Sequence, residues 1–236
     1  MPFVMLARPL HLAVVLAAAA HAMPVHAQER APAAPQIAAE EVANPPGLPA
    51  IGKWMIDHDG TVAHWLGEMH EGKRLHEPIN VIIVDAGAAS AEDAAKRLVA
   101  AMKAAGYPVR FGHSAGYRGL IGGGLYGQLP YGRDDAFSNH VFEETNNHGR
   151  VFGPHRAGDA FVFIAAFSRE RVNLLERPAH TYASFNQARD DLARRLDKQT
   201  AFQLTGTVPL ENAIADSPDI TTGDHDGNAV VLRTGK

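Results

Sequence analysis

The sequence contains no cysteine among its 236 residues. The protein therefore forms no disulfide bond, and a lipid anchor attached through cysteine is excluded. An apolar core has to supply the stability that a disulfide framework would otherwise provide. Residues 50–236 are enough for one domain with such a core and too few for two.

Positive charge is scarce and scattered. The chain carries 22 Lys and Arg against 26 Asp and Glu, a net charge of −4, and no basic cluster stands out. Nucleic acids and acidic membrane surfaces are therefore poor electrostatic partners. No apolar run is long enough to span a bilayer, which takes about 20 residues.

The first 27 residues have the order of parts found in a secretory signal peptide. Arg8 supplies the positive charge, residues 12–20 form a short apolar core, and residues 25–27 read Val-His-Ala, a small-residue cleavage signal. The alternative interpretation is an uncleaved anchor or a buried helix. We expect cleavage near Ala27, then an alanine- and proline-rich linker over residues 28–49. The mature protein, with 21 basic and 26 acidic residues and a net charge near −5, would be periplasmic or secreted.

Strand and helix signals predict an α+β domain over residues 50–236. The β-branched run over 79–84 is typical of a buried strand, and residues 160–167 are apolar on both faces, as in a central strand. Ser90 and Ser184 each fit the N-cap of a helix with an apolar stripe. Further strands are expected over 107–111, 180–183, 205–208 and 229–233. These elements predict a mixed, largely antiparallel sheet with two main helices on one face.

Segments rich in turn residues are interpreted as loops and tight turns. Seven glycines fall within residues 116–132, which predicts a loop with little regular structure. Residues 57–60 and 224–227 both read Asp-His-Asp-Gly, and each predicts a tight turn. A calcium loop would need more carboxylates at fixed offsets.

Residues 112–116 read Gly-His-Ser-Ala-Gly and match the Gly-x-Ser-x-Gly nucleophile elbow, with Ser114 as the nucleophile. Asp159 with His180, or His225, are candidates to complete a triad. The motif needs a helix directly after the serine, whereas the four glycines that follow within eight residues cost about 1 kcal/mol each in a helix. The alternative is a glycine-rich turn without a catalytic role.

The densest polar segment covers residues 138–155, and residues 138–152 predict a hairpin. Asn146 and Asn147 both tolerate the positive φ of a tight turn. With these two residues as the turn, Glu143 lies opposite Arg150 on the partner strand.

Strand alternation places His148 and Arg150 on one face of that hairpin, and His180 on another strand can approach the same surface. Arginine binds phosphate or carboxylate through two hydrogen bonds, and histidine donates or accepts protons near neutral pH. Glu143, His148, Arg150 and His180 are therefore the candidate residues for binding an anionic ligand. A cross-strand Glu–Arg pair beside solvent-facing histidines is the alternative.

Metal and cofactor motifs are not recognisable. The spacing of His140, His148, His155 and His180 does not match a metal motif such as His-Glu-x-x-His, so any metal site would have to be assembled by the fold. The triple glycine at 122–124 is not followed by the Gly-Lys-Ser/Thr of a phosphate loop. The sequence identifies no cofactor.

Residues 79–236 resemble the LssY C-terminal domain family, which is often attached to membrane-embedded proteins of the phosphatidic-acid-phosphatase type. The resemblance rests on the order of short segments: the strand 79–84, Ala105-Gly106-Tyr107, His148-Gly-Arg150-Val-Phe152, the strand-end His180, the helix near Arg189-Asp190, and the late strand at Asp226-Gly227. Asn147 and Phe152 stand where the family has a histidine and a tryptophan, so a role for a histidine pair is not carried over. The resemblance implies an envelope location and lipid or phosphate chemistry nearby, but no reaction.

Three hypotheses follow from these observations. The preferred one is an exported, single-domain protein that binds an anionic small molecule or a lipid headgroup. The second is a hydrolase that uses Ser114 or a metal site assembled by the fold. The third is a structural or interaction protein of the cell envelope without a small-molecule site.

Overall fold

A computed structural model describes residues 39–129 and 135–235 of the chain. The predicted signal peptide, residues 1–27, and residues 28–38 of the predicted linker lie outside the described residues. The described residues form one compact unit. None of the helices described is long and apolar enough to cross a membrane.

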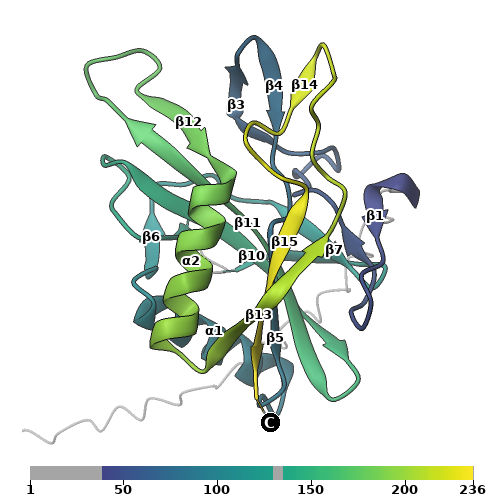
Figure 1. Cartoon of the computed structure of the whole chain (residues 1–236). Coiled ribbons are helices and arrows are strands. Elements are labelled where there is room, and N and C mark those ends of the chain that lie inside the picture. Colours follow the sequence, from purple (N-terminus) through teal and green to yellow (C-terminus); the bar gives the residue numbers. More distant parts are fainter. Residues whose placement is uncertain (1–38, 130–134, 236) are drawn as a thin grey trace, which may run out of the picture. The chain divides into compact units, whose positions relative to one another are not determined.

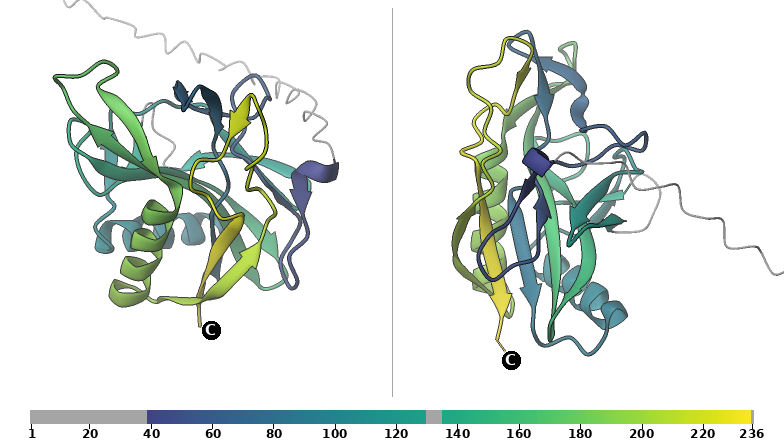
Figure 2. Two further views of the ribbon diagram at one scale, coloured as in Figure 1. Left: turned by 45° about the horizontal axis from the view of Figure 1, so that its top comes forward. Right: turned by 90° about the vertical axis from the view of Figure 1, so that its right-hand side faces the viewer.

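Twelve strands of the described residues form one curled, mixed sheet, and three more form a small second sheet (Figures 1 and 2). The strands are β1 Val42–Ala43, β2 Ile51–Gly52, β3 His64–His70, β4 Lys73–His76, β5 Val81–Asp85, β6 Val109–Phe111, β7 Arg118–Ile121, β8 Gly124–Leu129, β9 Asp135–Ser138, β10 Asn146–Ala157, β11 Ala160–Val172, β12 His180–Ser184, β13 Phe202–Pro209, β14 Ile220–Thr221 and β15 Asn228–Thr234. Within these, only β15 with β5 and β14 with β4 pair in parallel. The structure agrees with the predicted α+β class and mixed, largely antiparallel sheet.

Strand β5 lies in the middle of the sheet, between β11 and β15. All of its residues are buried, as the continuous apolar run predicts for a strand covered on both faces. Alternate side chains of the neighbouring strand β11 lie in two different hydrophobic clusters. Phe161, Phe163 and Phe167 belong to one cluster, and Val162 and Ile164 belong to the other. The prediction of a central strand over 160–167 is confirmed.

Both predicted helices begin at the predicted caps. Helix α1 (Ala91–Ala104) follows Ser90, whose Oγ accepts a hydrogen bond from the Asp93 backbone N–H at 3.1 Å. Helix α2 (Phe185–Gln199) follows Ser184, whose Oγ accepts from the Gln187 N–H at 2.9 Å. Each cap satisfies a helix N–H that would otherwise lack a partner.

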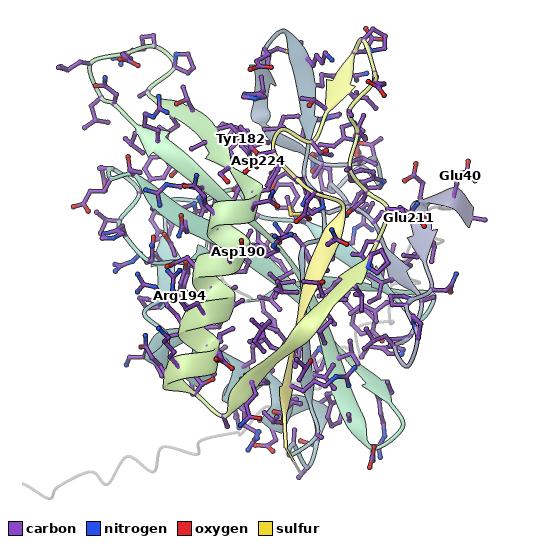
Figure 3. All side chains as sticks on the ribbon, viewed as in Figure 1. Glu40, Tyr182, Asp190, Arg194, Glu211 and Asp224 are labelled. Atoms are coloured by element: carbon purple, nitrogen blue, oxygen red, sulfur yellow. The ribbon has the colours of Figure 1, made fainter. Side chains whose placement is uncertain are left out.

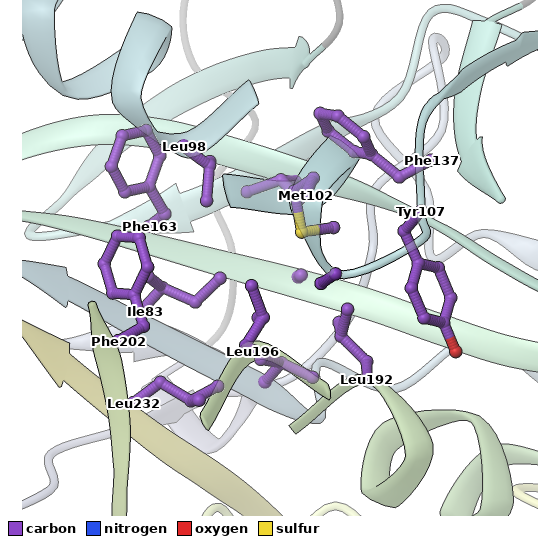
Figure 4. Packing of buried hydrophobic residues seen from close by; sticks show 14 of the residues in the cluster. Ile83, Leu98, Met102, Tyr107, Phe137, Phe163, Leu192, Leu196, Phe202 and Leu232 are labelled. Atoms are coloured by element: carbon purple, nitrogen blue, oxygen red, sulfur yellow. The ribbon is translucent and has the colours of Figure 1, made fainter. Parts of the chain in front are cut away.

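The larger hydrophobic cluster joins the helices to the sheet (Figure 4). It contains Leu98 and Met102 of α1 and Leu192 and Leu196 of α2, all of them fully buried. Burying one such side chain contributes about 2 kcal/mol to folding. The second cluster, which includes Phe152, Ile164 and Ile82, continues along the sheet towards His148 and Arg150.

The predicted loop over residues 116–132 is wrong where the structure describes it. Strands β7 and β8 pair as a hairpin, and Gly122 and Gly123 form its two-residue turn with φ of 57° and 80°. Two residues with positive φ form the hairpin turn that matches the twist of the strands, and Gly-Gly suits it. The high glycine content concealed this local turn signal.

The structured part begins earlier than the predicted boundary at residue 50. Val42 and Ala43 pair with β2, and a short 3₁₀ helix, Ala39–Glu41, precedes them. The Trp54 indole N–H donates to the carboxylate of Glu41. Residues 39–49 of the predicted linker therefore belong to the domain.

Gly149, between the two candidate residues on β10, allows the close approach of β11. A Cβ atom at this position would overlap the carbonyl oxygen of Ala166 and the ring of Phe167. We expect Gly149→Ala to lower the free energy of unfolding by about 3 kcal/mol, as overpacking does in a buried site. Urea denaturation measures this loss.

Gly127 of β8 provides the matched control, because a Cβ atom there meets nothing within 4 Å. We expect Gly127→Ala to change the free energy of unfolding by less than about 0.5 kcal/mol. Equal effects of the two substitutions would contradict the close approach at Gly149.

Candidate functional site

Polar side chains gather on the sheet beyond the second hydrophobic cluster, where β10, β11 and β12 lie side by side. We call the following residues the polar cluster: His113, Ser114, Tyr117, Asn146, His148, Arg150, Glu170 and His180. Ser114 is exposed and His180 is half-buried, whereas the other six are buried. The cluster therefore reaches the surface at two points.

The register of the strands explains how β10 and β11 contribute to the polar cluster. Asn146 lies opposite Glu170, His148 opposite Ser168, and Arg150 opposite Ala166. Residues opposite each other, and residues two apart on one strand, share a face of the sheet. This row continues the face of Phe152 with polar side chains in place of apolar ones.

Glu170 is the centre of the hydrogen-bond network. Its carboxylate accepts from the Asn146 side-chain amide and from His180 Nδ1, the latter at 3.2 Å. His148 Nδ1 lies 3.0 Å from Asn146 Oδ1 and 3.8 Å from Glu170 Oε1. Burial raises the pKa of Glu170. Burial, and next the charge of Arg150, lower the pKa of His148 well below its ordinary value, so this imidazole is neutral.

Arg150 is 3 % exposed, and Ser114 receives its hydrogen bonds. Its Nη2 donates to the Ser114 carbonyl oxygen at 3.0 Å and to Ser114 Oγ at 3.3 Å. Its Cζ lies 5.0 Å from the centre of the Tyr117 ring. Its Nε has no hydrogen-bond partner, and no carboxylate of the described residues lies within ion-pair distance. Arg150 is thus a buried cation whose donors are only partly used.

Glu77 is a second buried carboxyl group that interacts with Arg150. Burial raises its pKa to about 7, against the opposing charge of Arg150, and Asp57 raises it further. At neutral pH the Glu77 carboxyl is therefore close to half-ionised. The net charge around Arg150 consequently changes near physiological pH.

Phe142, in the loop between β9 and β10, contacts two of the three histidines of the polar cluster. Its ring stacks on His180 with 4.2 Å between centroids and meets His113 edge-on at 5.8 Å. His113 in turn stacks on His148 at 4.7 Å. Burial lowers the pKa of His113 to about 4, and its Nε2 has no partner.

Three of the four predicted ligand-binding residues, His148, Arg150 and His180, lie in the polar cluster, and Glu143 does not. Glu143 is exposed in the loop between β9 and β10. The predicted Asn146–Asn147 turn and the Glu143–Arg150 pair are wrong. The strand already begins at Asn146, and β10 pairs with β9 through His148 and Ser138. Both asparagine side chains are used in long-range hydrogen bonds, to Glu170 and to Tyr107.

Ser114 lacks the surroundings of the predicted nucleophile elbow. Strand β7 follows it in place of a helix, and its Oγ lies 3.0 Å from the Tyr117 hydroxyl. Among the described residues, no histidine is hydrogen-bonded to Ser114 Oγ. His225 instead lies 2.8 Å from Asn212 Oδ1. Asp159 lies in the short turn between β10 and β11.

The four histidines considered for a metal site do not come together. His140 is exposed beside Glu144, and His155 contacts the Tyr126 hydroxyl at 2.8 Å. Within residues 39–129 and 135–235, no group of three or more His, Asp or Glu side chains has an arrangement that could hold a metal ion.

The sequence interpretation missed Glu170, Asn146, His113 and Glu77. The signal for Glu170 is the change from apolar to polar residues after Ala166 on one face of β11. The signal for Glu77 is its position directly before the apolar run 79–84, where a charged side chain adjoins a buried strand. His113 has no local signal, because its burial depends on Phe142 and His148.

Comparison of the chain with protein-family models, with curated proteins and with solved structures gives no match.

Proposed function

We propose that the protein is an exported, single-domain binding protein for a small anion or an anionic headgroup. Arg150 would contact the anion, and His148 and His180 would line the site. The proposal for export rests on the signal-peptide features of residues 1–27. The LssY-like order of segments supports an envelope location and lipid or phosphate chemistry nearby.

The observation that carries this proposal is the buried guanidinium of Arg150. Buried charges in proteins are normally paired, because an unpaired charge loses its hydration without compensation. Arg150 has a free Nε and hydrogen bonds to the exposed Ser114. An anion that enters at Ser114 would supply the missing negative charge and accept from the guanidinium.

We infer that α1 and α2 cover one face of the sheet and leave the polar cluster on the other. The support is that the helices share one hydrophobic cluster with Phe163 and Val151, whereas Phe152, next along β10, lies in the other. Alternation on β10 then directs Arg150 away from the helices. The ligand would approach through the loop that carries Ser114.

The direct test is isothermal titration of residues 28–236 with two probes that share a phosphate group. Inorganic phosphate represents a free anion, and vesicles carrying phosphatidic acid represent a lipid headgroup. We expect at least one probe to bind with one site per chain. Binding of phosphate alone would identify a soluble ligand, binding of vesicles alone a lipid, and no binding of either would contradict the proposal.

The affinity for an anion should fall as the pH rises through 7. Glu77 ionises with a pKa of about 7 and then compensates the charge of Arg150 that the ligand would otherwise neutralise. For one linked proton, the limiting loss is about tenfold in affinity per pH unit above this value. Sulfate is the suitable probe in calorimetry, because its own charge does not change near neutral pH.

Glu77→Gln isolates this effect, because glutamine keeps the size of the side chain and cannot ionise. We expect the variant to bind sulfate with the low-pH affinity of the wild type at every pH tested. An unchanged pH dependence in Glu77→Gln would show that another group controls the affinity.

A further inference from the structure

A small pocket lies next to the polar cluster and shares His180 with it. Its volume is about 160 Å³, and Trp65, Met69, His70 and Leu75 line it from β3 and β4, with His180 and Tyr182 of β12. Figure 1 shows β3 and β4 beside the hairpin of β11 and β12. The pocket is smaller than the sites that hold drug-sized ligands, so it suits one small chemical group.

The aromatic rings of the pocket stand nearly at right angles to one another. The Trp65 and Tyr182 rings make an angle of 76° with centroids 6.1 Å apart, and the His70 and Tyr182 rings an angle of 74° at 4.8 Å. The Trp65 indole is held in place, because its N–H donates to Ser168 Oγ at 3.1 Å. The three rings therefore line the pocket at nearly right angles to their neighbours.

Hydrogen bonds to carboxylates increase the electron density of two of these rings. The Tyr182 hydroxyl donates to Asp224, which lies beside it near the start of α2 (Figure 3). His180 Nδ1 donates to Glu170. No lysine or arginine is among the described residues that line the pocket. The pocket thus favours positive charge, although its lining among the described residues includes no carboxylate for a direct ion pair.

We propose that this pocket binds a quaternary ammonium group, as in choline. Methylated ammonium ions are recognised by aromatic side chains, which interact with the cation through their π faces and with its methyl groups through apolar contact. A primary amine would lose the hydration of its N–H groups in this pocket without gaining acceptors. This cation site adjoins the anion site proposed at Arg150 and shares His180 with it, but choline, which carries no anionic group, does not require Arg150.

The two indole N–H signals in a ¹H–¹⁵N NMR spectrum provide the readout. Trp65 lines the pocket, whereas Trp54 donates to Glu41 and is the internal control. We expect choline to shift the Trp65 signal with saturation and to leave the Trp54 signal in place. The neutral isostere 3,3-dimethylbutan-1-ol should bind about tenfold more weakly, because it has the shape of choline without the charge. Equal binding of the two compounds, or no shift with choline, would overturn the proposal.

His70→Leu tests the contribution of one aromatic ring of the pocket, because leucine has a similar size and no ring. We expect it to weaken choline binding by about tenfold and to leave binding of the neutral isostere unchanged. His58→Leu is the control, because the His58 side chain is 78 % exposed and lies outside the pocket. Arg150→Met should bind choline like the wild type. Loss of choline binding in Arg150→Met would show that the two sites are one.

Discussion

The protein is expected to lose stability as the pH falls from about 6.5 to about 4. Burial lowers the pKa of His113 and of His225 to about 4, from 6.5 in the unfolded chain. A lowered pKa contributes stability that is present above the unfolded value and is lost as the pH falls towards the folded value. His113 and His225 should each lower the free energy of unfolding by about 3 kcal/mol over this pH range. His148, whose pKa is also lowered, adds to this loss.

Glu77 acts in the opposite direction. Its folded pKa of about 7 exceeds the unfolded value of 4.5, so its contribution is complete below pH 4.5 and is lost as the pH rises through 7. This gain of about 3 kcal/mol on acidification offsets the loss from one of the two histidines. Glu170, whose pKa burial also raises, acts in the same direction as Glu77, whereas His148 acts with the histidines. The remaining loss is a large fraction of a typical stability of about 5–15 kcal/mol.

Urea denaturation at several pH values, followed by tryptophan fluorescence, measures this effect. Replacing His225 by glutamine should reduce the loss of stability between pH 6.5 and 4 by about 3 kcal/mol, because glutamine can donate to Asn212 and does not titrate. His58→Gln, at an exposed position, should leave the loss unchanged. Stability that is constant or rises over this range would show that the buried histidines are not the controlling groups.

The elements that could be predicted are those with local signals. The buried strand β5 is a continuous apolar run, and α1 and α2 combine a serine cap with an apolar stripe. Central β11 is apolar on both faces. These patterns concern neighbouring residues, so they can be recognised in the sequence without knowledge of the remaining fold.

The elements that were missed depend on contacts between distant residues or on composition that hides a turn. The β7–β8 hairpin lies in a segment whose glycine content resembles a loop, although Gly122–Gly123 has the form of a hairpin turn. Asn146 and Asn147 tolerate turn geometry, but their side chains satisfy Glu170 and Tyr107 instead. Those partners are 24 and 40 residues away in the sequence.

The candidate site was predicted in part for the same reason. His148 and Arg150 share a face because of strand alternation, which the sequence shows. His180 joins them through Glu170 and through the Phe142 ring, and both contacts depend on how β10 and β12 pack against β11. Glu143 was assigned to the site because a turn at Asn146–Asn147 would place it opposite Arg150. That turn does not form, and Glu143 lies outside the polar cluster.

Arg150→Met should abolish anion binding and leave the protein folded. Removing one partner of a buried, charge-assisted interaction typically costs about 2–5 kcal/mol, which corresponds to a loss of roughly 30-fold to several thousandfold in affinity. Methionine fills a similar volume without a charge. In the absence of ligand, the free energy of unfolding should therefore be equal or higher, because an unpaired buried cation is removed.

Arg156 lies on the same strand, is exposed, and provides the matched control. Arg156→Met removes the same charge from the protein without altering the polar cluster. We expect it to bind the anion with wild-type affinity, so that a general effect of net charge can be separated from the effect at Arg150.

The most direct measurement is therefore calorimetric titration of the wild type, Arg150→Met and Arg156→Met with sulfate below pH 7, each with its free energy of unfolding. The account predicts one-site binding to the wild type and to Arg156→Met, no binding to Arg150→Met, and an Arg150→Met protein at least as stable as the wild type. Undiminished binding in a folded Arg150→Met protein would contradict an anion site at Arg150. So would a loss of stability large enough to show that Arg150 serves only the fold.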